Sequence, residues 1–183
     1  PIRSTIWVLP SKGGKAPAFL GGGGDVHTRV LQEMKAVLLG TFYPEYLDPT
    51  AKGFLRAARI FAKQLDLDKT GLVSEDGGVR WFPWVGTRCR RTLAILADLG
   101  GFKCEHDRIS LRFDASDKNQ CLAIIRELAN SSFTDEEICS RSAGLAVGKF
   151  DEYIPDELLV KVCKVEFLAM EEAMSALRAA SSR

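Results

Sequence analysis

The sequence has no long apolar run and no export signal. None of its apolar segments approaches the roughly 18 residues needed to cross a bilayer, and its first residues lack a basic region followed by an apolar stretch. We therefore expect no membrane span, no membrane partner and a cytoplasmic location. The 183 residues, 46% of them hydrophobic, are enough for one sizeable folded domain and exclude disorder over most of the chain.

Metal-binding patterns are also missing. The chain has two histidines, His27 and His106, and five cysteines without any C-x-x-C pair. A zinc site would have to be assembled from distant single residues, so we expect no metal here. The odd number and wide spacing of the cysteines predict free, buried thiols in a reducing compartment. The cysteines are Cys89, Cys104, Cys121, Cys139 and Cys163.

The motifs of nucleotide hydrolysis and nucleophilic catalysis do not occur. There is no G-K-[ST] triplet, and the four glycines at 21–24 fail the G-x-G-x-x-G pattern because Val26 stands where a glycine is required. No G-x-S-x-G occurs, and the acid pairs lie at helix starts, where the helix dipole explains them. The sequence thus predicts a chain without catalytic residues and without a cofactor of its own.

Hydrophobic periodicity predicts a mostly helical chain. Asp25 is the expected N-cap of a helix over Val26 to Leu39, and Asp48 with Pro49 marks the start of a helix at 49–65. In that second helix Phe54, Leu55, Ala58, Phe61, Ala62 and Leu65 form the expected buried stripe. Further helices are expected at 87–99, at 117–130 with Ser116 as cap, from the capping box Thr134/Glu137, from Pro155 and at 169–179, with fraying from about Ala180.

Three short segments have strand character, at 5–9, 79–84 and 108–113, whereas 67–78 is expected as a loop. The predicted fold is α+β, predominantly helical with a small mixed or antiparallel β-sheet. We expect a single domain over 1–183, in which a strand and a Gly-rich loop at 1–24 precede an α/β core at 25–133 and a helical subregion at 134–179.

Positive charge is concentrated in the first two thirds of the chain. Residues 134–183 hold ten acids and six bases, so the net charge of +1 divides into −4 there and +5 before it. This distribution permits a phosphate-binding face without requiring one.

The segment Val79 to Leu99 is the candidate for that face. It contains Arg80, Arg88, Arg90 and Arg91 with Trp81, Phe82 and Trp84, and no acid before Asp98. Arginines beside the positive start of a helix favour an anion, and exposed aromatic rings could stack on bases. In the alternative, equally open from the residues, the aromatics are core and the arginines form a solvated face.

Strand alternation limits how many of these rings can face outward. Trp81 and Phe82 cannot both lie on one face of a strand, and we expect Arg80, Phe82 and Trp84 to share a side unless Pro83 bends the chain. Lys12 and Lys15, in the loop before the glycine run, could fold over a partner; in the alternative, which we favour, the loop is a simple connection.

Three segments together resemble the C-terminal accessory region of bacterial DEAD/DEAH-box helicases of superfamily 2, of the Lhr-like kind. They are the strand-loop-helix Val8–Val30, the aromatic strand and arginine-bearing helix W-F-P-W-V-G-T-R-C-R-R-T-L-A at Trp81–Ala94, and K-F-D-E-Y-I-P-D-E-L-L at Lys149–Leu159. The resemblance implies that two RecA-like motor domains with ATP and Mg lie upstream in a longer chain, which would account for the first methionine being Met34.

The resemblance implies a non-catalytic domain that contacts DNA or RNA, or packs on the motor, to assist unwinding. The expected nucleic-acid contacts are Arg80, Arg88, Arg90, Arg91, Lys12, Lys15, Trp84 and Phe82. A second hypothesis is a protein scaffold that never touches nucleic acid, which a broad exposed apolar patch would favour. A third is an enzyme for a small phosphorylated ligand at the helix start near Thr87, which a polar pocket joining a histidine to a carboxylate would favour.

Overall fold

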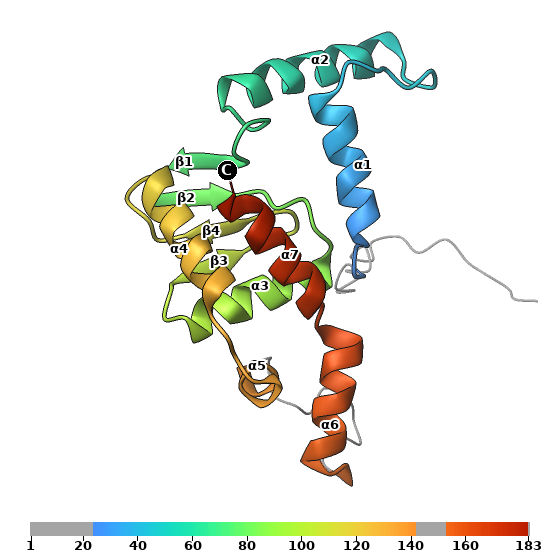
Figure 1. Cartoon of the computed structure of the whole chain (residues 1–183). Helices are drawn as coiled ribbons and strands as arrows, with labels where there is room; N and C mark the ends of the chain where they lie inside the picture. Colours follow the sequence, from blue (N-terminus) through green and yellow to red (C-terminus); the bar gives the residue numbers. More distant parts are fainter. Residues whose placement is uncertain (1–23, 142–152, 183) are drawn as a thin grey trace, which may run out of the picture.

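The computed structural model describes residues 24–141 and 153–182, and it shows the expected α+β fold, mostly helical around one small sheet (Figure 1). The strand expected at 5–9, most of the Gly-rich loop, Lys12 and Lys15 lie outside the described residues. Within the described residues, no helix combines the length and apolar character needed to cross a membrane.

The sheet has four antiparallel strands in the order β1-β2-β4-β3. They are β1 (Leu72–Glu75), β2 (Gly78–Trp81), β3 (Cys104–His106) and β4 (Leu111–Phe113). Strands were expected where β2 and β4 occur, but both are shorter than predicted. The expected loop at 67–78 was wrong in part, because it contains β1. A two-residue turn at Asp76–Gly77, with Gly77 at φ +75°, joins β1 to β2.

The two faces of the sheet differ in polarity. Val79 and Trp81 of β2 and Leu111 and Phe113 of β4 point into the main core and are almost completely buried. Three helices pack around that core: α3 (Thr87–Leu99), α4 (Lys118–Asn130) and α7 (Met170–Ser181). Figure 1 shows α4 and α7 side by side over the sheet, and the two helices pack against each other. The intervening residues, Arg80 and Arg112, lie on the outer face.

Two helices form an arm beside this body: α1 (Thr28–Leu39) and α2 (Pro49–Gln64) (Figure 1). As predicted, Asp48 caps α2, accepting a 2.7 Å hydrogen bond from the Ala51 amide. The prediction of Asp25 as cap of α1 was wrong, because His27 Nδ1 takes that position and accepts from the Arg29 amide at 3.2 Å.

The arm is joined to the body at both of its ends. At the start of α1, the Val26 amide donates to Thr87 Oγ1 at 3.0 Å and the Thr87 amide donates to the Val26 carbonyl at 2.9 Å. At the other end, a small apolar cluster of Ala62, Leu67 and Trp84 packs against Leu38 and Leu39 of α1. The stretch between these two contacts projects from the body.

The C-terminal third contains α5 (Asp135–Arg141), α6 (Asp156–Val162) and a π-helical turn, η2 (Cys163–Phe167), before α7. The capping box is confirmed: the Thr134 amide donates to Glu137 Oε2 at 2.7 Å and the Glu137 amide donates to Thr134 Oγ1 at 3.2 Å. Two other predictions were wrong. Asp117, rather than Ser116, caps α4, and Ala180 is buried within α7 instead of fraying.

Candidate functional site

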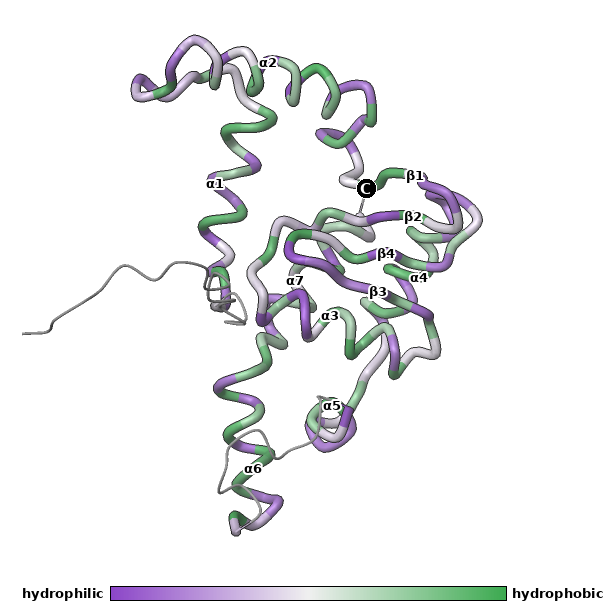
Figure 2. Tube along the Cα trace, turned by 180° about the vertical axis from the view of Figure 1, so that it is seen from behind, coloured by the Kyte–Doolittle hydropathy of each residue, from purple (hydrophilic) through white to green (hydrophobic). Residues whose placement is uncertain are grey.

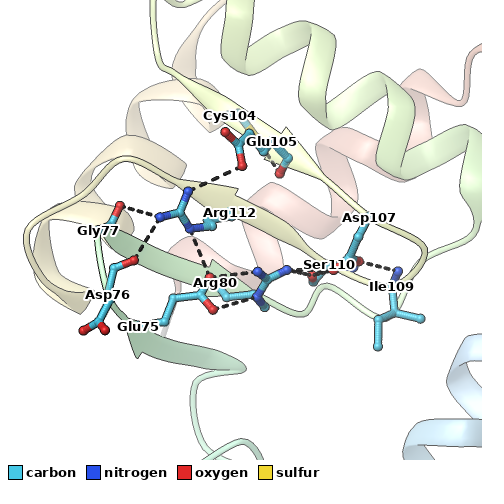
Figure 3. A network of polar contacts seen from close by, with 10 residues as sticks. All are labelled: Glu75, Asp76, Gly77, Arg80, Cys104, Glu105, Asp107, Ile109, Ser110 and Arg112. Carbon is cyan, nitrogen blue, oxygen red and sulfur yellow. Dashed lines mark hydrogen bonds and ion pairs between the residues drawn. The ribbon is translucent and has the colours of Figure 1, made fainter.

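Arg80 belongs to a polar network on the outer face of the sheet (Figure 3). In the β2–β4 register it stands directly opposite Arg112, a like charge that would destabilise the pair. Glu75 relieves this repulsion, because its Oε1 lies 3.0 Å from Arg80 Nη2 and 3.2 Å from Arg112 Nε. Arg80 Nη1 also lies 2.7 Å from Asp107 Oδ2. The Arg80 guanidinium is therefore already paired with two carboxylates of this chain.

Asp107 is held as a carboxylate by its surroundings. Burial raises its pKa, but amide hydrogen bonds from Ile109 and Ser110, the Ser110 hydroxyl and the charge of Arg80 together bring the pKa below the ordinary value of 3.8. The two amides donate to Oδ1 at 2.8 Å each. Asp107 thus serves as a fixed anion for Arg80 and a turn-forming residue between β3 and β4.

Arg88 and Arg91 fasten α3 to the segment that precedes α7. Arg88 Nη2 donates to the carbonyls of Val165 and, at 2.6 Å, Leu168, while Arg91 Nη1 donates to the Phe167 carbonyl at 3.3 Å. Arg91 Nη2 also pairs with Asp25 Oδ1 at 3.2 Å, beside the start of α1. These two arginines act as intramolecular clamps between α3, η2 and the arm.

Arg90 and Trp84 are buried. Arg90 is only 4% exposed, and its Nη1 donates to the Val85 carbonyl at 3.4 Å. Burial lowers the Arg90 pKa and the charge of Asp107 acts in the opposite direction. Trp84 is 7% exposed and has a φ of +57°, and its ring packs 6.1 Å from that of the half-buried Phe82. Neither Arg90 nor Trp84 lies on an exposed surface of this structure.

The expectation that Arg80, Phe82 and Trp84 share a side was wrong for Arg80, because Phe82 and Trp84 pack together whereas Arg80 lies in the polar network on the sheet. Strand β2 ends at Trp81, so alternation does not extend through Pro83, and the left-handed backbone of Trp84 turns that ring into the cluster below α2. Arg80 lies on the sheet and the other three arginines lie on α3, each with partners within the chain. The described structure does not gather these residues into one open phosphate-binding surface.

The arm presents a different surface, which is apolar. In α2, Phe54 is 72% and Phe61 is 61% exposed, and the loop before α2 carries Tyr46 at 87%. The prediction that Phe54 and Phe61 belong to a buried stripe was wrong: Ala62 is the buried residue of α2, because the rest of the molecule touches the side of this helix that carries Ala62. Figure 2 shows apolar residues along both arm helices. The exposed set on the arm and its loop is Val26, Val30, Met34, Phe42, Tyr46, Phe54, Ile60 and Phe61.

The loop between α1 and α2 is held by Arg59. Its guanidinium donates to the carbonyls of Val37, at 2.7 Å from Nη2, of Thr41, at 3.2 Å, and of Phe42. The Val37 carbonyl belongs to the last turn of α1, where the helix leaves acceptors without intrahelical partners, and the other two belong to the loop that follows. The exposed rings of the loop therefore extend from a backbone that side-chain hydrogen bonds keep in place. Sequence patterns gave no sign of this clamp.

A cavity of about 650 Å³ opens where the starts of α1, α3 and α7 meet. His27 and Asp25 line it together with Arg88, near the expected anion position at Thr87. His27 Nδ1 is occupied by its capping bond, and Cys89, which also lines the cavity, has a pKa raised by burial to about 12. Glu171 and Glu172 add negative charge at the same opening. These features oppose both an activated thiol and an anionic ligand.

Among the described residues no group of three or more histidine, cysteine or acidic side chains is arranged to hold a metal ion. No family model, curated protein or solved structure gives a significant match to this chain.

Proposed function

We propose that this chain is a non-catalytic docking domain that packs on another protein domain through the α1–α2 arm. The observation that carries the proposal is the concentration of large exposed apolar side chains on the arm and its loop, eight of the twelve in the described structure. Exposed apolar surface of this kind is typical of protein interaction sites.

The chemistry of the arm supports a protein partner. Aromatic residues and methionine are enriched at protein interfaces, and the arm exposes Phe42, Tyr46, Phe54, Phe61 and Met34. The Arg59 bonds hold the backbone at the start of the loop between the helices, so that backbone loses little conformational freedom on binding. The arginines that were expected to bind nucleic acid instead have hydrogen-bond and ion-pair partners within the chain. This favours protein docking over phosphate binding by these arginines.

The resemblance at Trp81–Ala94 and Lys149–Leu159 supports a particular partner. We infer that the arm packs on the RecA-like motor domains of an ATP-dependent DEAD/DEAH-box helicase, for which this chain is the C-terminal accessory domain. ATP and Mg would be bound by the motor domains, in the cytoplasm, and hydrolysis would take place there. Five cysteines that form no disulfide are compatible with a reducing compartment.

The test is hydrogen exchange on the natural gene product that contains this sequence, compared with the 183-residue chain alone. Docking predicts slower amide exchange in α1 and α2 of the gene product. The double variant Phe54→Asp, Phe61→Asp is expected to abolish that difference, since it places two charges in the apolar contact.

The matched control is Val162→Asp with Val165→Asp. These two exposed apolar residues lie on α6 and η2, away from the arm, so the same added charge should leave arm exchange unchanged. Equal exchange of α1 and α2 in the gene product and in the isolated chain would refute docking. Absence of ATP-dependent unwinding by the gene product would refute the helicase assignment separately.

A further inference from the structure

Helix α2 carries all of its charge on one side, and all of it is positive. Between Pro49 and Gln64 the helix has four bases and no acid. They follow one another at intervals of four, three and four residues: Lys52, Arg56, Arg59 and Lys63. At 3.6 residues per turn these intervals return to the same face, so the four side chains form one row along the helix.

Three members of the row have no partner within the described residues. Arg59 is the exception, since it clamps the end of α1. Among residues 24–141 and 153–182 there is no ion pair or hydrogen bond from the side chains of Lys52, Arg56 or Lys63. By contrast, Arg80, Arg91 and Arg112 each meet a carboxylate. Like charges at i, i+4 destabilise a helix by roughly 0.2–0.5 kcal/mol, and an anion bound along the row would relieve that repulsion.

The row faces away from Phe54 and Phe61, the two exposed rings of α2 that we call the docking ridge. Phe54 follows Lys52 by two residues, and Phe61 follows Arg59 by two residues. Two residues correspond to roughly 200° around the helix, so the two rings lie on the side opposite the row. One side of α2 is therefore apolar and the other basic, and a protein docked on Phe54 and Phe61 would leave Lys52, Arg56 and Lys63 open. This arrangement suits two different partners on opposite sides of one helix.

We propose that Lys52, Arg56 and Lys63 bind the phosphate backbone of a nucleic acid. A linear row of bases along a helix matches a polymer that repeats one negative charge per nucleotide, and such contacts are independent of base sequence. The surface is separate from the arginines of β2 and α3, whose guanidinium groups have internal partners. It is also separate from the docking ridge. A test of nucleic-acid binding at this row can therefore fail while the proposed docking of the arm holds, and the reverse is also possible.

The test is fluorescence anisotropy of the 183-residue chain with labelled single-stranded DNA, single-stranded RNA and duplex DNA, over a series of salt concentrations. The variant is Lys52→Gln, Arg56→Gln, Lys63→Gln. We expect it to bind at least tenfold more weakly at low salt. For single strands the slope of log affinity against log salt should decrease by about 2, because three phosphate contacts at about 0.7 each are lost.

The matched control removes the same charge elsewhere. Arg108, Lys161 and Arg178 are exposed and likewise have no side-chain partner among the described residues, and Arg108→Gln, Lys161→Gln, Arg178→Gln should retain the affinity and slope of the original chain. Circular dichroism checks that both variants stay folded. The proposal is overturned by three results: no binding to any of the nucleic acids at low salt, equal weakening by both variants, or row-dependent binding to vesicles of anionic lipid without binding to nucleic acid.

Discussion

Arg59 lies over the ring of Tyr43, with its guanidinium carbon 4.4 Å from the ring centroid. The same guanidinium donates to the Val37 carbonyl in the last turn of α1 and to the Thr41 and Phe42 carbonyls in the loop. One side chain of α2 therefore joins the helix pair and orders the loop between them. Arg59→Gln should lower the free energy of unfolding by about 1–2 kcal/mol, because charged hydrogen bonds and a cation–π contact are lost. Arg56→Gln, on the same helix without a partner, should leave the free energy within about 0.5 kcal/mol. Urea unfolding compares the two.

Gly86 is the point at which the starts of α1 and α3 come closest. A Cβ there would lie 2.5 Å from the Val26 carbonyl oxygen and 2.7 Å from the Thr28 amide nitrogen. Gly86→Ala should therefore destabilise the fold by about 1–3 kcal/mol by forcing α1 away from α3. Gly53→Ala has open space around the new methyl group and should stabilise α2 by about 0.5–1 kcal/mol. An increase in melting temperature for both variants would contradict the close approach.

Asp107 makes the stability of the fold depend on pH in the acidic range. The pKa of Asp107 is below 3.8 in the folded chain. The contribution of this carboxylate to the free energy of unfolding is therefore fully present above the ordinary pKa of 3.8, and it is lost as pH falls through the folded pKa. Melting temperatures between about pH 5 and about pH 2 should fall less steeply for Asp107→Asn than for the original chain. Asp76→Asn, at an exposed turn position, is the control and should keep the original pH dependence. An unchanged pH dependence in Asp107→Asn would contradict the role of this carboxylate.

The cysteines should react slowly with thiol reagents in the folded chain. Burial raises the pKa of Cys89, Cys104, Cys121 and Cys139 from 9.0 to about 12, which lowers the thiolate fraction by about 1,000-fold. Cys104 is the least buried and should be modified first. Mass spectrometry after brief alkylation at mild alkaline pH should show little labelling before unfolding and five modified thiols after it. Fast labelling of several thiols in the native chain would contradict the burial described above.

Local chemistry allowed much of the fold to be predicted from the sequence. Asp48 with Pro49 specifies the start of α2 by cap geometry alone, and the Thr134/Glu137 box does the same before α5. Short strands were harder, because β1 has four residues and too little periodicity to stand out. The Asp76–Gly77 dipeptide was the available signal for the β1–β2 hairpin.

The site was less predictable, because a sequence pattern does not say which chain covers an apolar stripe. Phe54 and Phe61 have the spacing of a core face, yet that face of α2 is exposed in this chain. A run of arginines in a sequence also does not show which groups those arginines contact. The pairing of β1 with β2 brings Glu75 to Arg80, and the fold brings the Val165 carbonyl to Arg88, which is 77 positions away in the sequence. Both facts depend on tertiary contacts that periodicity and composition do not encode.

The docking of the arm is tested most directly by photo-crosslinking from position 61 of the natural gene product. A benzophenone amino acid placed there should crosslink to residues outside α1 and α2, in the motor domains, and the same group at position 165 on η2 should not reach those residues. Mass spectrometry that finds position 61 linked only to neighbouring residues of the arm, or to nothing, would contradict the account.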